Sequence, residues 1–287
     1  MASSLPSART LLVLGRASNL PTVWSNCFAG WLLGGGGPVR ALAQLCVGGS
    51  LLYLGGMYLN DAFDASFDRQ FRRERPIPSG AIEERLVWQL GFGLLGLGWL
   101  LLALLGWSSA LLATLLVVAV LVYDAVHKAV AFSPVLMAAC RFFLLLVAAS
   151  ASQGGVTGES VWNALALAGW IVGLSYVAKR ESTTGQLQRW PLAPLALPLL
   201  FAALYNFHAE SQGRALVLAV VLVAWAGWCL RHTFLTGNRN LGLTVAGLLA
   251  GICLVDVLAV TPSWAGCAVF GGLFLASLLG QRFVPAT

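Results

Sequence analysis

The sequence predicts an all-α polytopic membrane protein. Of its 287 residues, 59% are hydrophobic and only 10% are charged, and the mean hydropathy is +0.82. Soluble domains carry about 25% charged residues, so these values exclude an ordinary soluble protein. The chain is long enough for about ten spans of ~20 residues with short loops, and it shows no fixed-period repeat and no low-complexity linker. We therefore expect residues 1–287 to form a single membrane-embedded domain.

Ten apolar segments follow one another along the chain. The first is interrupted by Pro21 and by a run of four glycines, and the third and fourth lie in one long apolar region that can be divided at more than one place. The segments are residues 20–35, 41–59, 86–106, 108–123, 133–152, 161–178, 191–207, 214–231, 241–260 and 264–282. Most approach the length that a membrane-spanning helix needs. We expect no cleavable signal peptide in residues 1–16, because their short apolar core runs directly into an arginine.

Basic residues are divided very unequally between the two sides of this arrangement. With ten spans and a cytoplasmic N-terminus, fourteen Lys and Arg residues lie inside, Arg40 and Arg214 lie outside, and Arg141 falls within a span. The inner group is Arg9, Arg16, Arg69, Arg72, Arg73, Arg75, Arg85, Lys128, Lys179, Arg180, Arg189, Arg231, Arg239 and Arg282. Such asymmetry orients membrane proteins. We expect an integral protein of the bacterial inner membrane with its N-terminus and active-site loops in the cytoplasm.

The net charge of +6 follows from this topology and from contact with anionic membrane lipid on the cytoplasmic face. It therefore indicates no nucleic-acid partner. The six cysteines and three histidines are scattered along the chain without the spacing of a zinc site, and we interpret the cysteines as packing residues.

One stretch, NDAFDASFDRQFRRERPIPSG, concentrates charge between Asn60 and Gly80. On a helix, Asn60, Asp61, Asp64 and Asp68 form an oxygen-rich stripe about two turns long at the end of the second span. Carboxylates are costly there unless they are paired or face a polar cavity. One interpretation is a structural network of ion pairs between these acids and the arginines that follow them.

The other interpretation of the stripe is a site for a divalent cation and a diphosphate. Mg²⁺ prefers oxygen ligands and is usually held by one or two carboxylates together with substrate phosphates. Neighbouring guanidinium groups bind phosphate oxygens in forked contacts. We favour this metal–diphosphate interpretation because the acids, the basic cluster and the membrane location agree. Pro76 and Pro78 then end the helix, and we expect the loop to fold back over the charged site.

Several motifs resemble those of the UbiA superfamily of intramembrane prenyltransferases. NDAFDASFD resembles its NDxxDxxxD motif, and RPIPSG resembles the continuation of that motif. LGRASNLPTVWSN resembles the first-helix signature, with Ala17 where many members have proline, and YDAVHK from Tyr123 to Lys128 resembles the tyrosine-to-lysine stretch that ends the fourth helix. Together with GGMYLND and MAACRFF, these motifs are most similar to the branch found in ebo-type bacterial gene clusters.

The resemblance implies a bundle of nine to ten transmembrane helices around a central cavity. It implies Mg²⁺-dependent transfer of an isoprenyl group from an isoprenyl diphosphate donor to a small aromatic or lipophilic acceptor at the cytoplasmic face. The alternatives are a protein that binds a diphosphate lipid without turnover, and a membrane transporter. A transporter is less favoured because its acids usually lie near the midplane between inverted repeats.

The implied site residues fall into three groups. Catalytic roles are expected for Asp64, Asp68, Tyr123 and Lys128. The diphosphate is expected to contact Arg16, Arg72, Arg75, Lys179 and Arg141. The metal ligands and their supporting residues are expected to be Asn60, Asp61, Asp64, Asp68 and Glu181.

A second acidic motif of the superfamily, DxxxD, is depleted in this chain. In SYVAKRESTTGQLQRWP, Glu181 takes the place of the last aspartate, whereas Val177 stands where the first belongs and Lys179 lies between them. Either one metal suffices, with Lys179 and Arg180 neutralising the diphosphate, or the ligand differs from an ordinary prenyl diphosphate. The basic residues also fit an ordinary cytoplasmic loop.

Two ionisable residues lie inside predicted spans. We expect Arg141 to point into the bundle and pair with Asp124, or to bind a diphosphate or an acceptor carboxylate. Asp256 is expected to be protonated or to hydrogen-bond with a neighbouring helix, and a general-base role is the less favoured alternative.

Overall fold

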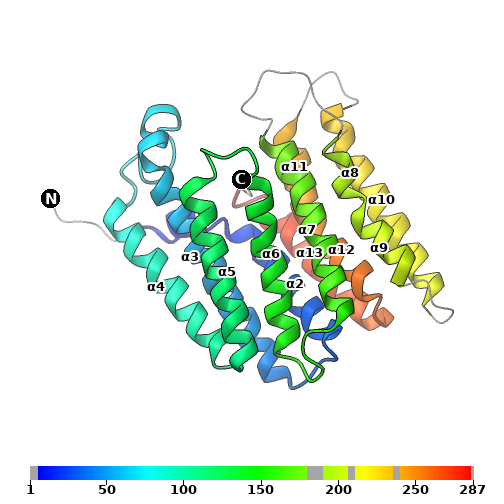
Figure 1. Ribbon diagram of the computed structural model, residues 1–287. Helices are drawn as coiled ribbons and strands as arrows, with labels where there is room; N and C mark the ends of the chain where they lie inside the picture. The colour runs from blue at the N-terminus through cyan, green and yellow to red at the C-terminus, as the bar shows by residue number, and fades with distance from the viewer. Residues whose placement is uncertain (1–5, 180–189, 206–210, 235–239, 286–287) are drawn as a thin grey trace.

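The computed structural model describes residues 6–179, 190–205, 211–234 and 240–285, and all regular structure within them is helical (Figure 1). The long helices stand side by side in one bundle. In chain order the elements are α1 (Ala8–Leu14), η1 (Ala17–Asn19), α2 (Leu20–Leu33), α3 (Val39–Phe71), α4 (Glu84–Ala103), α5 (Trp107–Val126), α6 (Ser133–Ser150), α7 (Gly158–Lys179), α8 (Leu192–Leu195), α9 (Leu197–Tyr205), α10 (Gln212–Phe234), α11 (Leu241–Ala250), α12 (Ile252–Val260) and α13 (Trp264–Gly280). The predicted all-α class is confirmed.

All ten predicted apolar segments coincide with helices in the described part of the chain. Seven of these are long and apolar enough to cross a membrane: α3, α4, α5, α6, α7, α10 and the consecutive pair α11–α12. The remaining three segments form shorter helices, namely α2, α8–α9 and α13. Many large apolar side chains on the outer helix faces are exposed, such as Leu216, Val220 and Leu275. A lipid environment is the solvent in which such faces are stable.

Small residues let α3 and α4 pack closely. A Cβ atom at Gly55 would lie 2.9 Å from the carbonyl oxygen of Gly91, and one at Gly98 would lie 2.9 Å from the carbonyl oxygen of Gly48. Pairs of glycines one heptad apart therefore face each other on the two helices. Close backbone approach of this kind is typical of helix packing in membranes, and it packs α4 directly against α3.

The length of α3 decides where the acidic stripe lies. Its 33 residues make it about 50 Å long at 1.5 Å per residue, whereas the hydrocarbon core of a bilayer is about 30 Å thick. The last turns, which carry the acids, therefore have room to extend beyond the apolar part of the bundle.

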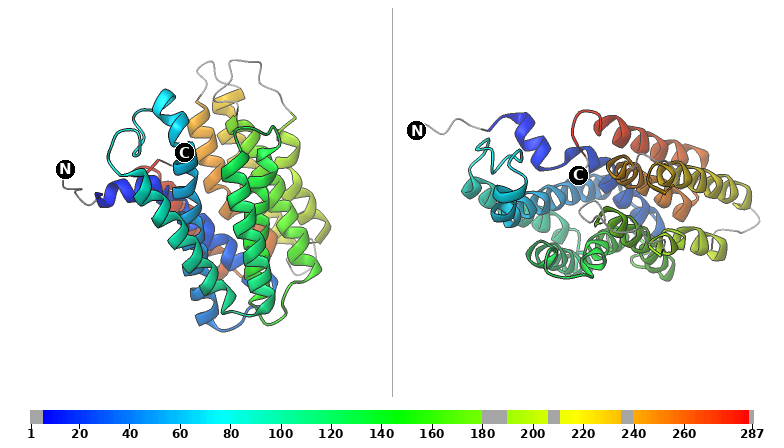
Figure 2. Two further views of the ribbon diagram at one scale, coloured as in Figure 1. Left: turned by 60° about the vertical axis from the view of Figure 1, so that its left-hand side comes forward. Right: turned by 90° about the horizontal axis from the view of Figure 1, so that it is seen from above.

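After α3 the chain folds back, as the two prolines predict. Ile77 is buried in one cluster with Leu14, Tyr58 and Ala65, so the loop packs on α3 and on the N-terminal helix α1. Gly80 adopts a φ of +77° at the end of the turn, a left-handed conformation that glycine accepts without strain. Figure 2 shows this loop (cyan) beside the blue N-terminal segment at one edge of the molecule.

Candidate functional site

The end of α3 presents a row of buried polar side chains. Asn60, Asp61, Asp64 and Asp68 expose only 5%, 6%, 7% and 1% of their surface, respectively. Because one turn of helix takes 3.6 residues, they stack one above another along the helix. The oxygen-rich stripe expected from the sequence is therefore present, and it faces protein, which requires compensating partners for its charge.

Two arginines from different parts of the chain meet at Asp61. Arg75 Nη1 lies 2.8 Å from Asp61 Oδ1, and Arg16 Nη2 lies 3.4 Å from the same oxygen. Arg75 also reaches Asp68, with its Nε 3.7 Å from Asp68 Oδ2. The loop after α3 thus returns its arginine to the helix that it has just left.

The backbone of Arg16 is strained. It has φ 42° and ψ 50°, in the left-handed region that residues with a Cβ atom seldom adopt. This conformation separates α1 from η1, and the side chain turns toward α3, where Nη1 lies 3.2 Å from Met57 Sδ. Strain of this kind persists only where the surrounding structure enforces it, and such residues cluster at functional sites.

The end of α5 supplies the partners of Asp64. Lys128 Nζ lies 2.7 Å from Asp64 Oδ1, and His127 Nε2 lies 3.4 Å from the same oxygen. Burial lowers the pKa of His127, but its contact with the Asp64 carboxylate outweighs burial, so the pKa lies above the ordinary histidine value. Lys128 Nζ also lies 3.9 Å from the centre of the Phe67 ring, and Tyr123 stacks on His127.

Two buried carboxylate oxygens at this end of the bundle have no hydrogen-bond partner. Asn60 Nδ2 donates to Asp124 Oδ1 at 3.0 Å, which leaves Asp124 Oδ2 without a partner. Asp68 Oδ1 is also buried and unpartnered. Leaving a buried polar atom unsatisfied costs about 1–3 kcal/mol, and more for a charged group. Two such oxygens in one cluster indicate a place for a ligand that supplies positive charge or hydrogen-bond donors.

The residues of the cluster fit a metal that arrives with phosphate. Among the described residues, no three His, Cys, Asp or Glu side chains come close enough to hold a metal ion by themselves. Mg²⁺ does not need such a cage, because it is usually bound by one or two carboxylates, water and substrate phosphates. The oxygen-only ligand atoms of Asn60, Asp64, Asp68 and Asp124 match that preference, and the nearby arginines and lysine match phosphate.

Other residues predicted for the site lie elsewhere or outside the described residues. Arg72 caps the end of α3 and is exposed. Lys179, at the end of α7, donates hydrogen bonds to the carbonyl of Val130 and to Ser133 Oγ, so it holds the connection between α5 and α6. Glu181 and Arg180 fall outside the described residues. Val177, at the place of the missing acid, is buried in α7.

The expected pair of Arg141 and Asp124 is wrong. Arg141 Nη1 donates to Asn26 Oδ1 at 2.7 Å, and Nη2 donates to Thr22 Oγ1 at 3.0 Å. The reason is depth, because Arg141 lies eight residues into α6 whereas Asp124 lies at the end of α5. Of the two alternatives for Asp256, the hydrogen bond with another helix is found, since its Oδ2 accepts from Ser25 and Asn26 of α2 at 2.5 Å and 2.8 Å.

Sequence reasoning did not assign Asp124 and His127 to this cluster, where they contact Asn60 and Asp64. Asp124 was expected only as a partner of Arg141, and His127 counted only as one of three scattered histidines. Both lie inside the stretch YDAVHK, whose ends Tyr123 and Lys128 were already assigned to the site. Their side chains complete the cluster because α5 ends beside the last turns of α3.

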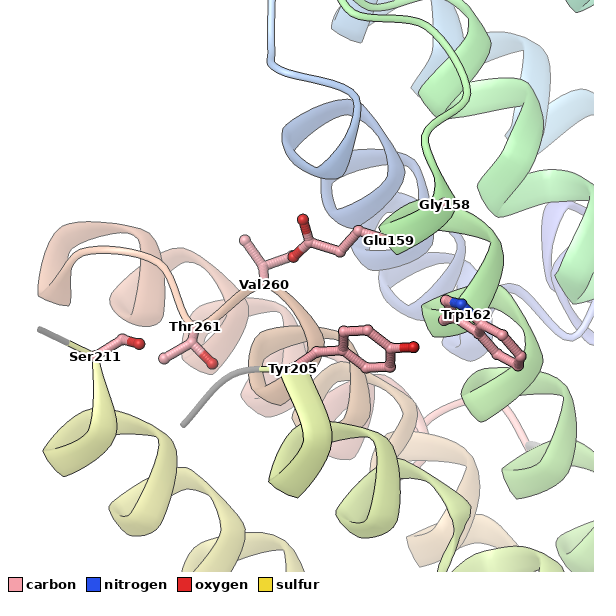
Figure 3. Close-up of a pocket in the computed structure, with 7 residues that line it drawn as sticks. All are labelled: Gly158, Glu159, Trp162, Tyr205, Ser211, Val260 and Thr261. Carbon is pink, nitrogen blue, oxygen red and sulfur yellow. The ribbon is translucent and has the colours of Figure 1, made fainter. Parts of the chain in front are cut away.

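A separate hollow of about 430 Å³ lies at the other end of α7. Its lining is Gly158, Glu159, Trp162, Tyr205, Ser211, Val260 and Thr261 (Figure 3). Among the described residues that line it, Glu159 is the single carboxylate and none is basic. Because α7 runs from Gly158 to Lys179, the whole length of that helix separates this hollow from the acidic cluster, and it does not suit a diphosphate.

The chain is similar to known proteins in sequence and in structure. The sequence model of the UbiA prenyltransferase family matches residues 19–282. Over 82 residues the chain is 43% identical to digeranylgeranylglyceryl phosphate synthase of Metallosphaera sedula. That match spans 29% of the chain and 28% of the length of the relative.

Solved structures show the same fold. A structure from work on digeranylgeranylglyceryl phosphate synthase in membranes has a TM-score of 0.62 and 17% identity, over 93% of this chain and 98% of its own. The apo structure of a UbiA homologue from Aeropyrum pernix K1 has a TM-score of 0.61 and 17% identity, over 86% of this chain and 97% of its own. Such low identity establishes a shared fold and nothing finer.

Proposed function

The chain belongs to the UbiA prenyltransferase family, and we propose that it transfers an isoprenyl group from a lipid diphosphate to a small aromatic or lipophilic acceptor with the help of Mg²⁺. We place the reaction at the cytoplasmic face of a bacterial inner membrane, in a bundle that crosses it nine or ten times. The quoted motifs support the ebo-cluster branch of the family. The basic residues at the site end of the bundle support the orientation.

The observation that carries the proposal is the meeting of acids and cations at the end of α3. Four carboxylates, those of Asp61, Asp64, Asp68 and Asp124, are buried together. Their fixed cationic partners are Arg16, Arg75 and Lys128. Two carboxylate oxygens remain without any partner. A purely structural network would be expected to leave no buried oxygen unpaired, whereas a site for a metal and phosphates needs free oxygens.

We assign the acidic residues and the basic residues of the cluster different roles. Asn60, Asp64, Asp68 and Asp124 would hold Mg²⁺ through oxygen, and bound Mg²⁺ would supply positive charge to the departing diphosphate. Asp61 already accepts from two arginines, so we assign it the role of positioning Arg16 and Arg75. Those arginines and Lys128 donate hydrogen bonds to phosphate oxygens.

The chemistry needs charge stabilisation where the allylic C–O bond breaks. Both electrons of that bond leave with the diphosphate, and the prenyl carbon forms its new bond to the acceptor, which loses a proton to water. The cations that face the diphosphate stabilise the charge that develops on it. Tyr123 stacks on His127 beside Asp64, and we assign its ring to the wall near the developing prenyl cation. One metal suffices in this proposal, because Val177 replaces an acid of the second motif.

The test is metal-dependent release of diphosphate by the purified protein in detergent. Farnesyl and geranylgeranyl diphosphate serve as donors, with and without a quinone-precursor and lipid extract as acceptor. We expect release that requires Mg²⁺, that a chelator stops, and that Asp64→Asn reduces at least a hundredfold. Glu159→Gln, which removes a carboxylate at the opposite end of α7, is the matched control and should behave as the unaltered protein.

A protein that binds a diphosphate lipid without turnover is the alternative that the depleted second motif supports. Saturable, Mg²⁺-dependent binding of a donor without any release of diphosphate would favour it and overturn the enzyme proposal. A transporter has weaker support, since the clustered carboxylates lie at one end of the bundle and not near its middle.

A further inference from the structure

Arg141 is a cation in the middle of the bundle that the site at the end of α3 does not use. It lies on α6, eight residues after Ser133, so it stands about 12 Å from the start of that helix at 1.5 Å per residue. An arginine at such depth is costly, and such residues usually face a partner or a polar cavity. The contacts of Arg141 therefore indicate its role.

The direct partners of Arg141 are neutral. Its two hydrogen bonds run to Asn26 Oδ1 and Thr22 Oγ1, both on α2. Among the described residues it forms no ion pair, because the nearest carboxylate in its network, that of Asp256, accepts from Ser25 and Asn26 instead. The amide of Asn26 thus lies between the Arg141 guanidinium and the Asp256 carboxylate, because it accepts from the first and donates to the second.

Arg141 also has hydrogen-bonding capacity to spare. A guanidinium carries five N–H donors, and two of the hydrogen bonds that they could make are found here, neither from Nε. Thr22 and Asn26 are completely buried, yet Arg141 itself is only partly buried. Part of the Arg141 side chain is therefore left uncovered by α2.

Partly exposed side chains lead from Arg141 along α3 toward the acidic cluster. The guanidinium carbon of Arg141 lies 5.7 Å from the centre of the Tyr53 ring. Tyr53, Met57 and Asn60 share one helix face, being four and seven residues apart, and Tyr53 and Met57 are both partly exposed. Met57 is in turn the contact of Arg16. Tyr53 stands about 10 Å from Asn60 along the helix, so one face of α3 joins Arg141 to the proposed diphosphate site.

We infer that Arg141, with Thr22 and Asn26, binds an oxyanion of the acceptor, a carboxylate or a phosphate, and holds the acceptor beneath the prenyl diphosphate. The inference rests on the proposed function, because it adds a binding residue for the acceptor to the proposed site of prenyl transfer. A planar guanidinium matches either oxyanion in a forked contact. The neutral hydroxyl of Thr22 and amide of Asn26 orient it without cancelling its charge.

The competing role is structural, because the same bonds tie α6 to α2 and, through Asn26, to α12. A structural tie predicts that replacing Arg141 lowers thermal stability and leaves ligand binding unchanged. An oxyanion site predicts that acidic acceptors bind more tightly than their neutral counterparts, and that this preference needs Arg141.

The experiment measures ligand-induced stabilisation of the detergent-purified protein by intrinsic tryptophan fluorescence on heating. Two matched pairs of probes are titrated: 4-hydroxybenzoate with its methyl ester, and a 1-O-alkylglyceryl phosphate with the corresponding alkylglycerol. The first pair represents a small carboxylic acid, and the second represents a lipid phosphate. The proteins are unaltered protein, Arg141→Lys, Arg141→Gln and, as the matched control, Arg85→Gln at an exposed arginine on α4.

We expect the unaltered protein and Arg85→Gln to prefer the acid of one pair over its neutral partner. Arg141→Gln should weaken binding of that acid at least tenfold and leave the neutral partner unaffected, whereas Arg141→Lys should retain part of the preference. No preference in either pair for the unaltered protein would overturn the inference, and that outcome does not depend on any variant folding. Binding of the acid that is unchanged in Arg141→Gln would also overturn the inference.

Failure of this inference is distinguishable from failure of the proposed function. Binding of the acceptor probes is measured without turnover. Diphosphate release from the donor without added acceptor, with water taking the prenyl group, tests the proposed function independently, and the control Arg85→Gln should leave that release unchanged. Loss of release in Arg141→Gln with acid preference intact would assign Arg141 to the diphosphate and contradict the inference.

Discussion

Arg75 Nη1 lies 2.8 Å from Asp61 Oδ1, although fourteen residues separate them and a helix end lies between. The contact is made because the prolines after α3 reverse the chain and Ile77 anchors the loop on α1 and α3. One side chain therefore both closes the loop over the acids and supplies a cation to them. The acids and the loop that covers them form one unit.

Replacing Arg75 by glutamine should release this loop and weaken donor binding. The remaining side chain cannot neutralise Asp61 and Asp68, so we expect faster hydrogen exchange in residues 72–83 and at least tenfold weaker binding of a prenyl diphosphate with Mg²⁺. Hydrogen exchange by mass spectrometry and a donor titration measure the two effects. Arg73→Gln is the control, since Arg73 is an exposed arginine two residues earlier. Equal exchange in both variants would mean that Ile77 alone holds the loop.

Asp124→Asn should raise the Mg²⁺ requirement. Asparagine has nearly the shape of aspartate and can still accept from Asn60 through its amide oxygen, but it loses the negative charge at the position of the unpartnered Oδ2. We expect the Mg²⁺ concentration for half-maximal diphosphate release to increase by about tenfold or more, as for other groups that tune a metal site, with recovery at high Mg²⁺. An unchanged Mg²⁺ curve would restrict Asp124 to orienting Asn60.

Two substitutions of Arg16 should differ in stability although both remove the guanidinium. Glycine accepts the left-handed backbone at this position without strain, whereas alanine does not. We expect Arg16→Gly to be more stable than Arg16→Ala by about 1 kcal/mol, with both equally impaired in donor binding. Thermal unfolding of the two proteins in detergent makes the comparison. If they unfold together, the backbone has relaxed and Arg16 carries no strain.

The glycine contacts between α3 and α4 predict a position-specific loss of stability. Gly55→Ala places a Cβ atom 2.9 Å from the backbone oxygen of Gly91, and overpacking of this kind costs about 1–3 kcal/mol. Gly93→Ala, on α4 with no atom within 4 Å of the new Cβ, should instead be neutral or stabilising, because alanine favours helix by up to about 1 kcal/mol. The midpoint of thermal unfolding is the measurement. Similar losses in both variants would contradict the close packing described here.

Local properties explain what was predictable from the sequence. The all-α class and the apolar segments follow from composition, and the acidic stripe follows from the helical period, since Asn60, Asp61, Asp64 and Asp68 belong to one helix. The fold-back of the loop follows from Pro76 and Pro78, which no helix interior accommodates. Each of these features depends on residues close together in the chain.

The pairing of charges needed the tertiary structure. Any of several basic residues could have balanced Asp61, and the packing of α1 and the loop on α3 selected Arg16 and Arg75 over Arg72. Asp124 met Asn60 in place of Arg141, because depth in the bundle separates helix ends from helix centres. The sequence by itself determined which residues carry charge and which helix displays them. Only the packing of helices distant in the chain decided which charges meet, because partners tens of residues apart are brought within 3 Å by interhelical contacts that no local pattern encodes.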